Sequence, residues 1–264
     1  MGVKIVLVDA FTPSPFGGNP AGVCVLDEAR STDWMALVAR EVNAPATAFV
    51  RVRGDGAFEL RWFSPARELE LCGHGTLATA HVLWESGRLD AQCAARFQTQ
   101  AGTLTAACRN GWIELDFPMT PAAPVAPPPA LLAALDVRPR FVGRSRFDYL
   151  VEVENEGALV AVRPDLGLLE TCDARGAIVT SAADDPQVDF VSRYFAPAFG
   201  IDEDPATGST HCCLAPYWSA RLGRSDLVAH QVSARRGIIR TALAGDRVRL
   251  SGQAVTVIRG ELLA

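Results

Sequence analysis

RWFSPARELELCGHGTLATAHVLWESG, residues 61–87, decides the fold, because it places a strand, a glycine-rich turn and an apolar helix in direct succession. The aromatic and aliphatic residues at 58–62 favour a strand. Gly73-His74-Gly75 then opens the helix, and Gly87 is placed to end it. This order of elements predicts an α/β protein.

The same order of features occurs a second time. Residues 63–84 and 195–218 both contain F-x-P-A, an acidic segment, a glycine-rich turn and an apolar helix that reaches a tryptophan. Internal duplication explains this similarity. Chance explains it as well, since Phe, Pro and Ala are common residues, and the sequence leaves both explanations open.

The first half of the chain is predicted to be rich in strands. Ser31-Thr32-Asp33 is expected to cap a helix over 34–41, with Met35, Leu37 and Val38 on its apolar face. Gly54-Asp55-Gly56 predicts a hairpin turn between two of the strands. The predicted strands are 3–8, 23–26, 48–52, 58–62, 68–71, 94–99, 103–108 and 112–117.

A proline-rich segment, PMTPAAPVAPPP at 118–129, is the best candidate for a domain linker. We therefore expect an N-terminal lobe at 1–117 and a C-terminal lobe at 130–264, whose last strand is a candidate to pack back onto the first lobe. Helices are predicted at 130–135, 165–172 and 207–222. Strands are predicted at 147–154, 158–162, 177–181 and 189–195, with four more between 230 and 262.

Composition limits the classes of function. The chain has 264 residues, 49% of them hydrophobic, a net charge of −5 and no basic run. These values indicate a substantial core and argue against a nucleic-acid or membrane partner. Lys4 is the only lysine in the sequence, so Schiff-base chemistry has one candidate and the G-x-x-x-x-G-K-[ST] phosphate loop is absent.

The sequence predicts neither export nor membrane insertion. The first residues, MGVKIVLVDAF, lack the basic and long apolar regions of a signal peptide. The longest uncharged stretch, 117–135, contains six prolines, which a membrane-spanning helix does not tolerate. The seven cysteines include no C-x-x-C pair, so we expect free thiols in a reducing cytoplasm.

The two glycine-rich helix starts are candidate anion sites. Unpaired N–H groups and the positive end of the helix dipole attract a carboxylate there, and glycine lets a ligand approach the backbone closely. The alternative is that the glycines only permit tight turns between strand and helix. The internal similarity favours the functional interpretation.

Candidate proton-transfer groups accompany each helix start. His74 lies in the first turn and Asp204 just before the second helix, where a histidine and a carboxylate are suited to acid–base chemistry. The structural alternatives are a local hydrogen bond for His74 and a helix cap for Asp204. Thr76 and Ser209 either donate to a substrate or complete their helices. Cys72 is either a thiolate activated by the helix start or a small buried residue.

Other motifs are weaker. G-H-G-T-L-A at 73–78 matches the dinucleotide fingerprint, but no second strand ending in an acid follows about 20 residues later. His211-Cys212-Cys213 could suggest a metal site, but adjacent positions on a helix point in different directions. His81 and these three residues are therefore predicted to be core or helix-face residues. The G-x-S-x-G elbow is absent.

Five blocks in order resemble the PhzF-like phenazine-biosynthesis family, within the diaminopimelate-epimerase superfold, and CGHGT together with EDPATGS makes the resemblance specific. The blocks are VDAFTPSPFGGNPAGV (8–23), NAPATAFV (43–50), RWFSPARELELCGHGTLATAHVL (61–83), IDEDPATGSTHCCLAPYW (201–218) and SARRGIIRTALAGDRVRLSGQAVTVIRGEL (233–262).

This resemblance implies two similar α/β lobes, each a curled mixed sheet around a central helix, with the active site in a cleft between them. It implies a homodimeric isomerase without cofactor or metal, which moves a proton within a small carboxylated substrate; the phenazine-pathway member isomerises trans-2,3-dihydro-3-hydroxyanthranilate. The residues that it implies are catalytic His74 and Asp204, and substrate-binding Gly73, Gly208, Ser209 and Asn19. The first glycine-rich turn adds Gly75 and Thr76 as candidate substrate-binding residues.

One departure from the family pattern matters for the mechanism. The family's catalytic glutamate lies in N-x-x-E-T-x-F-V, where this chain has Ala46. A positioned acid or base typically contributes a factor of about 10²–10⁴ in rate. Glu41 is predicted to end the preceding helix, so it is a poor substitute for the family's glutamate. The related epimerases and racemases use two cysteines; Cys72 matches the first place, but Pro205 stands at the second.

Three functions therefore stay open on the sequence alone. The first is a PhzF-like isomerase in which the glutamate is replaced by Ala46. The second is a catalytically reduced protein that binds a small anion on the same scaffold. The third, which the missing second cysteine disfavours, is a racemase or epimerase.

Overall fold

The computed structural model describes residues 2–53 and 56–263 and divides the chain into two compact units. Unit 1 comprises Met1–Phe117 and Ser251–Ala264, and unit 2 comprises Pro118–Leu250. Two residues of the hairpin turn predicted at 54–56 lie outside the described residues. No helix in the described part of the chain is long and apolar enough to cross a membrane.

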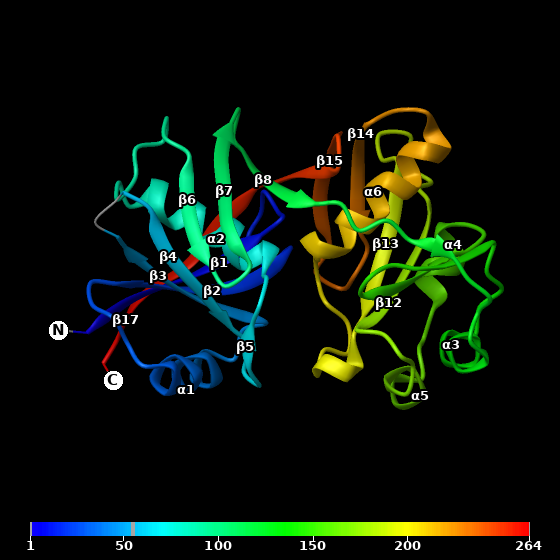
Figure 1. The fold of residues 1–264 in the computed structure, drawn as a ribbon, viewed down its shortest axis with the longest axis horizontal. Coiled ribbons are helices and arrows are strands. Elements are labelled where there is room, and N and C mark those ends of the chain that lie inside the picture. Colours follow the sequence, from blue (N-terminus) through cyan, green and yellow to red (C-terminus); the bar gives the residue numbers. More distant parts are fainter. Residues whose placement is uncertain (1, 54–55, 264) are drawn as a thin grey trace. The chain divides into compact units, whose positions relative to one another are not determined.

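Unit 1 is a mixed sheet with two helices (Figure 1). Its strands are β1 (Val3–Ala10), β2 (Asn19–Leu26), β3 (Ala46–Val52), β4 (Phe58–Phe63), β5 (Glu68–Leu69), β6 (Ala95–Thr99), β7 (Gly102–Arg109), β8 (Trp112–Pro118) and β17 (Ala254–Leu262). Its helices are α1 (Thr32–Val42) and α2 (Gly73–Glu85). α2 contacts β1, β2, β3, β7 and β17, so the sheet wraps around this helix.

The strand order of unit 1 combines distant parts of the sequence. β17, near the C-terminus, pairs antiparallel with β1, which also pairs antiparallel with β2. β2 and β3 are parallel, β3 and β4 antiparallel, and β4 and β6 parallel. β6, β7 and β8 then form an antiparallel meander. Each parallel pair requires a crossover, which α1 and α2 supply.

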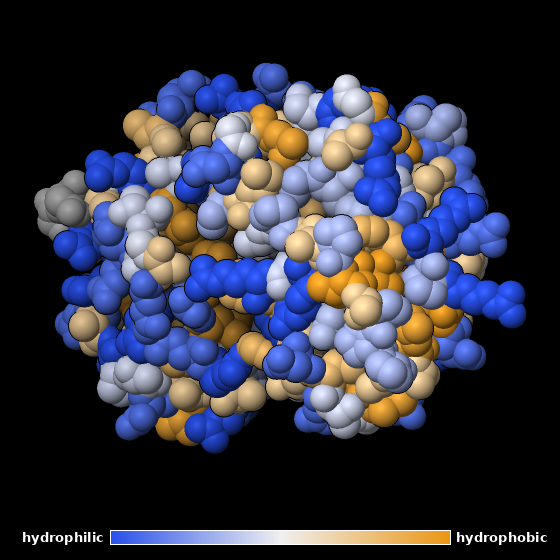
Figure 2. Space-filling model, turned by 45° about the vertical axis from the view of Figure 1, so that its right-hand side comes forward, coloured by the Kyte–Doolittle hydropathy of each residue, from blue (hydrophilic) through white to orange (hydrophobic). Residues whose placement is uncertain are grey.

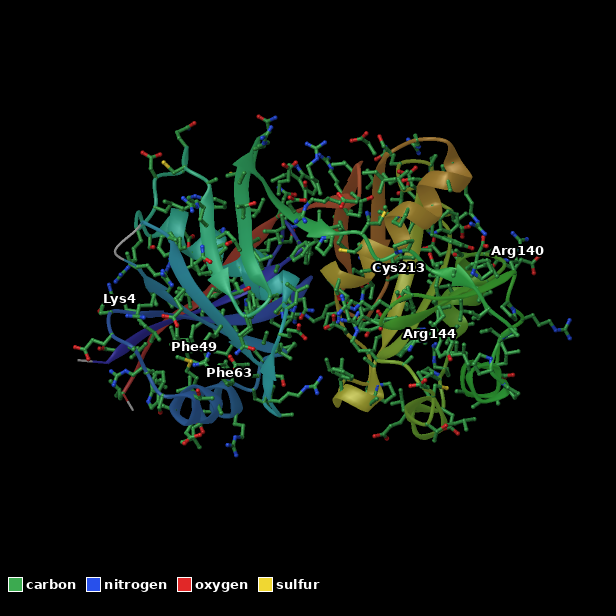
Figure 3. The ribbon with its side chains drawn as sticks, viewed as in Figure 1. Lys4, Phe49, Phe63, Arg140, Arg144 and Cys213 are labelled. Carbon is green, nitrogen blue, oxygen red and sulfur yellow. The ribbon has the colours of Figure 1, made fainter. Side chains whose placement is uncertain are left out.

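Helix α1 begins as the sequence predicts. The hydroxyl of Ser31 accepts a hydrogen bond from the backbone N–H of Trp34 at 3.2 Å, which satisfies one exposed donor at the helix end. The predicted apolar face is wrong at one position, because Leu37 is 59% exposed. On the sheet side of the helix, Phe49 and Phe63 (labelled in Figure 3) meet edge to face with ring centroids 5.6 Å apart.

Unit 2 is a second mixed sheet, with α6 as its longest described helix. Its strands are β9 (Ala123–Pro124), β10 (Phe141–Arg144), β11 (Asp148–Glu152), β12 (Gly176–Ala182), β13 (Phe190–Phe195), β14 (Asp226–Gln231), β15 (Gly237–Ala244) and β16 (Arg247–Gly252). Its helices are α3 (Pro129–Leu135), α4 (Glu156–Ala161), α5 (Leu166–Glu170), the 3₁₀ turn η1 (Pro197–Phe199) and α6 (Gly208–Leu222).

The two units repeat one order of strand pairings. In unit 2, β10–β11 is antiparallel, β11–β12 parallel, β12–β13 antiparallel, β13–β14 parallel and β14–β15 antiparallel. Unit 1 has the same alternation from β1–β2 to β6–β7. α2 and α6 occupy the same place, as the crossover of the second parallel pair. This shared topology favours duplication over chance.

The predicted elements differ from the structure at two segments, and one strand is absent from the prediction. The predicted strand at 158–162 is wrong: the side chain of Asn155 caps a helix, α4, by accepting from Ala158 N at 2.8 Å. Strand β10 was not predicted. The segment 118–129 is part of unit 2, where β9 pairs with β10.

The face of the molecule in Figure 2 carries both hydrophilic and hydrophobic side chains. Figure 2 shows hydrophilic side chains over much of the visible face, with hydrophobic side chains in separate patches. The largest fully buried side chains include Trp62 and Phe97 in unit 1 and Phe190 and Phe195 in unit 2, so each unit has its own core.

Candidate active site

The start of α2 is capped by sulfur. Cys72 is the N-cap residue, with extended backbone, and its Sγ accepts a hydrogen bond from Gly75 N at 3.4 Å. The first turn contains no acidic residue. The hydroxyl of Thr76 donates to the carbonyl oxygen of Cys72 at 2.6 Å, so within unit 1 this hydroxyl serves its own helix. The positive end of the α2 dipole is therefore not neutralised by an acid of its own first turn.

His74 is packed against the same sulfur. Its ring nitrogens lie 3.6 Å (Nδ1) and 3.9 Å (Nε2) from Cys72 Sγ, and both side chains are buried. The sulfur is thus almost equidistant from the two nitrogens. An imidazole and a thiol at a helix N-terminus can hold or move a proton, because the ring can accept or donate one and the positive end of the helix dipole favours negative charge nearby.

Gly75 is required by the close approach of an indole. A Cβ added at this position would lie 2.8 Å from Cδ1 of Trp62 and 3.0 Å from Sγ of Cys72. The Nε1–H of Trp62 is buried and has no hydrogen-bond partner among the described residues. Sequence reasoning did not single out Trp62, since it lies in β4, before the glycine-rich turn of the 61–83 block.

The predicted residues Asn19 and Ala46 lie at the ends of neighbouring strands. Asn19 begins β2 opposite Ala10, and Ala46 begins β3, next to Ala21 in the parallel pair. Asn19 and Ala46 are both fully buried. Glu41, in α1, is exposed, so it does not bring a buried carboxylate to unit 1 in place of the missing glutamate.

The start of α6 has no side-chain cap. Thr207 is the N-cap residue, but its hydroxyl makes no bond to the helix N–H groups, and the first turn contains no acid. That hydroxyl instead donates a short hydrogen bond to Oδ2 of Asp204. Gly208 is buried and Ser209 half-buried at this end of the helix. The helix start therefore keeps the donors and the positive dipole end that an anion needs.

Asp204 is held by its backbone as well as by its side chain. It is 6% exposed. Its N–H donates to the carbonyl oxygen of Tyr194 at 3.0 Å, and its own carbonyl oxygen accepts from Nε2 of Gln231 at 2.6 Å. Together with the bond from Thr207, these contacts fix the carboxylate in one orientation.

Two ion pairs support the segment that carries Asp204. Nε and Nη2 of Arg193 donate to the two carboxylate oxygens of Glu203 at 2.8 and 2.9 Å. Arg175 makes a similar two-bonded pair with the buried carboxylate of Asp148, which also accepts from the hydroxyl of Tyr194 at 2.9 Å. Burial and the nearby Asp148 charge raise the pKa of Tyr194 well above its usual value, so this hydroxyl remains a donor.

The adjacent residues His211, Cys212 and Cys213 make separate contacts in α6. Nδ1 of His211 lies 2.8 Å from the carbonyl oxygen of Thr207, and burial lowers the pKa of this histidine to about 4. Burial raises the pKa of the Cys213 thiol (Figure 3) to about 12. Among the described residues, no three His, Cys, Asp or Glu side chains gather as a metal site would require.

The predicted residues therefore form two groups, one in each unit. Gly73, His74, Gly75 and Thr76 share the start of α2, with Asn19 and Ala46 on strands of the same unit. Asp204, Gly208 and Ser209 lie at the start of α6. Each group joins a helix start to a side chain that can exchange a proton.

Comparison with known proteins gives consistent matches over the chain. The PhzC-PhzF family model, described as phenazine biosynthesis-like protein, matches residues 8–260. An uncharacterized isomerase from Halalkalibacterium halodurans is 49% identical over 264 residues, which cover 100% of this chain and 99% of that protein. The crystal structure of a PhzF-family protein from Enterococcus faecalis is 37% identical, with a TM-score of 0.95 over 100% of both chains.

A more distant structure supports the fold class. A predicted epimerase from Pseudomonas aeruginosa is 24% identical, with a TM-score of 0.74 over 99% of both chains. At 24% identity, this structural similarity is evidence for a shared fold alone. The α/β, epimerase-like fold class expected from the sequence is confirmed.

Proposed function

Because the chain belongs to the phenazine biosynthesis-like (PhzC-PhzF) family, we propose that it is a cofactor-independent isomerase that moves a proton within a small carboxylated metabolite. Relatives named as isomerases support the reaction class. The observation that carries the proposal is that each unit has a helix start without an acid in its first turn and beside a proton-exchanging side chain, His74 or Asp204.

Each residue has a role in this proposal. The N–H groups around Gly73 and Gly208 bind the oxygens of the substrate, and the hydroxyl of Ser209 donates to one of them. In the proton shift, one atom of the substrate loses a proton and another gains one. Asp204 exchanges the proton at a carbon atom, and His74 exchanges the proton at the other position. The hydroxyl of Thr207 donates to Oδ2 of Asp204 and so orients the carboxylate between these steps.

The test is a panel of dihydro-hydroxyanthranilate-like acids, with isomerisation followed by NMR. Asp204→Asn is expected to lower kcat by about 10²–10⁴-fold, since it removes the group that exchanges the proton. Asp202→Asn is the matched control, because Asp202 is exposed two residues away and should keep wild-type activity. Equal activity of the two variants would refute the role of Asp204.

Ala46 favours a second candidate, a protein that binds a small carboxylate without converting it. The family's acid is absent there, and the alanine is completely buried in β3. Calorimetry should then detect binding of small carboxylates, and NMR should detect no turnover. Activity on a family substrate that occurs only after Ala46→Glu would identify the natural chain as catalytically reduced for that reaction; turnover by the wild type would exclude this candidate.

The quaternary structure and compartment are further parts of the proposal. We propose a cytoplasmic homodimer, on the basis of the family resemblance and of seven cysteines that form no described disulfide. Light scattering on the purified protein tests the dimer. A mass equal to one 28.2 kDa chain over a range of concentrations would refute it.

A further inference from the structure

Gln231, the last residue of β14, forms hydrogen bonds to both Asp204 and Thr207 at the start of α6. Its side chain is fully buried. Oε1 accepts from the backbone N–H of Thr207 at 2.8 Å, and Nε2 lies 2.6 Å from the carbonyl oxygen of Asp204 and 3.1 Å from Oγ1 of Thr207. One amide side chain therefore makes three hydrogen bonds to two residues more than twenty positions earlier in the chain.

The chemistry of these partners fixes the orientation of the Gln231 amide. A backbone N–H can only donate, so the atom that faces Thr207 N must be the oxygen. A backbone carbonyl can only accept, so the atom that faces Asp204 O must be the NH₂ group. The two assignments agree, and the flipped amide would lose both bonds. Gln231 is therefore a donor toward Oγ1 of Thr207.

The direction of the next hydrogen bond follows from the carboxylate. A carboxylate oxygen can only accept, so the hydroxyl of Thr207 donates to Oδ2 of Asp204 while its Oγ1 accepts from Gln231. The carbonyl oxygen of Thr207 is held by the hydroxyl of Thr210 at 2.9 Å and by Nδ1 of His211 at 2.8 Å. Every backbone and side-chain polar atom of Thr207 thus has a partner, so the residue is fixed in place.

We infer that Gln231 and Thr207 form a positioning relay, Gln231 Nε2–H to Thr207 Oγ1–H to Asp204 Oδ2, which holds Oδ2 as a hydrogen-bond acceptor. This inference rests on the proposed function, in which Asp204 exchanges a proton with the substrate. The relay assigns that exchange to the other carboxylate oxygen, Oδ1. A proton on Oδ2 would point at the hydroxyl proton that Thr207 already directs to this oxygen. Gln231 contacts Asp204 and Thr207 and acts through them.

Gln231→Glu tests the direction of the relay with almost no change in shape. Its carboxylate still accepts from Thr207 N, but the oxygen that replaces Nε2 repels the carbonyl of Asp204 and attracts the hydroxyl proton of Thr207. The bond to Asp204 is then lost, and we expect kcat to fall about 10²-fold with little change in KM. Protonation of the new carboxyl restores one donor, so activity relative to wild type should recover as pH falls.

A second pair of variants keeps the test valid if Gln231→Glu fails to fold. Thr207→Val removes the hydroxyl and should lower kcat to a similar extent, whereas Thr207→Ser keeps it and should retain most activity. Thr241→Val is the matched control, because Thr241 is a buried threonine of the same unit whose hydroxyl has no partner among the described residues. It should leave kcat unchanged.

Kinetics and NMR together separate the relay from the proposed function. An active wild type with folded Gln231→Glu and Thr207→Val variants of normal kcat would overturn the relay and leave the function standing. A wild type that converts no acid would overturn the function. The relay is then judged by NMR: a slowly exchanging hydroxyl proton of Thr207 that shifts in Asp204→Asn supports it, and the absence of such a proton overturns it.

Discussion

The sulfur of Cys72 lies 3.6 Å from Nδ1 of His74, and the same sulfur caps α2 through Gly75 N. Cys72 therefore has a structural role as an N-cap and a position from which a thiol could exchange protons with the imidazole. The two roles make different demands on the side chain. A cap needs a hydrogen-bond acceptor of this size, whereas proton exchange needs an acidic thiol.

Substitution of Cys72 separates these roles. In the proposed mechanism His74 and Asp204 exchange the protons, so Cys72→Ser, which retains an acceptor for the cap, should keep both stability and activity. Cys72→Ala should lose the cap and about 1 kcal/mol of unfolding free energy. Urea unfolding and steady-state kinetics measure the two effects. A folded Cys72→Ser protein without activity would show that the thiol takes part, as in a racemase-like mechanism.

His211 should make the fold sensitive to acid. Burial lowers its folded-state pKa from 6.5 to about 4, so the unfolded chain takes up a proton at higher pH than the folded chain does. Stability is therefore complete above pH 6.5 and decreases as pH falls toward 4, by about 3 kcal/mol at 1.36 kcal/mol per unit. Unfolding free energies measured from pH 7 to 4 test this. His211→Asn, which can still donate to Thr207, should flatten the dependence; an unchanged slope would exclude His211 as its source.

Gly237→Ala should disturb the segment that carries Asp204. An added Cβ would lie 2.5 Å from Cβ of Ala206, which directly precedes Thr207. We expect a loss of about 1–3 kcal/mol in stability from this overlap, together with a lower kcat. Gly167→Ala in α5 is the control, because its nearest neighbour would lie at an ordinary 3.5 Å. Equal melting temperatures for the two variants would contradict the close packing of Gly237 against Ala206.

Thr241→Val should stabilise unit 2. The hydroxyl of Thr241 is buried in β15 and has no partner among the described residues, so it loses water on folding without gaining a bond. Replacement by the isosteric valine should raise the unfolding free energy by about 1 kcal/mol. Chemical denaturation measures the change. A loss of stability would show that the hydroxyl has a bound water or another partner.

The order of elements could be predicted from the sequence where turn chemistry marks it. Ser31 identified the start of α1, and the glycine turns identified the starts of α2 and α6. The segment 158–162 misled the prediction, because its alternating valines favour a strand while the cap at Asn155 starts a helix. Leu37 is exposed because only one side of α1 packs on the sheet, and a residue two positions from Met35 lies on another side of the helix.

The candidate site could be predicted only as far as its motifs extend. His74 and Asp204 lie inside the two glycine-rich blocks, so the sequence singles them out. Gln231 lies outside both blocks, and Trp62 lies in β4, before the glycine-rich turn of its block. Gln231 comes close to Thr207 because β14 returns beside β13 after α6, and Trp62 reaches Gly75 from β4. Such contacts depend on strand pairing between distant segments, which a single sequence does not reveal.

Solvent deuterium incorporation tests the central claim most directly. A dihydro-hydroxyanthranilate-like acid is incubated with the protein in D₂O, and deuterium at carbon is followed by NMR. We predict that wild type and Asp202→Asn incorporate deuterium during isomerisation and that Asp204→Asn incorporates it about 10²–10⁴-fold more slowly. Incorporation at the same rate in Asp204→Asn, or none above background in wild type, would contradict the account.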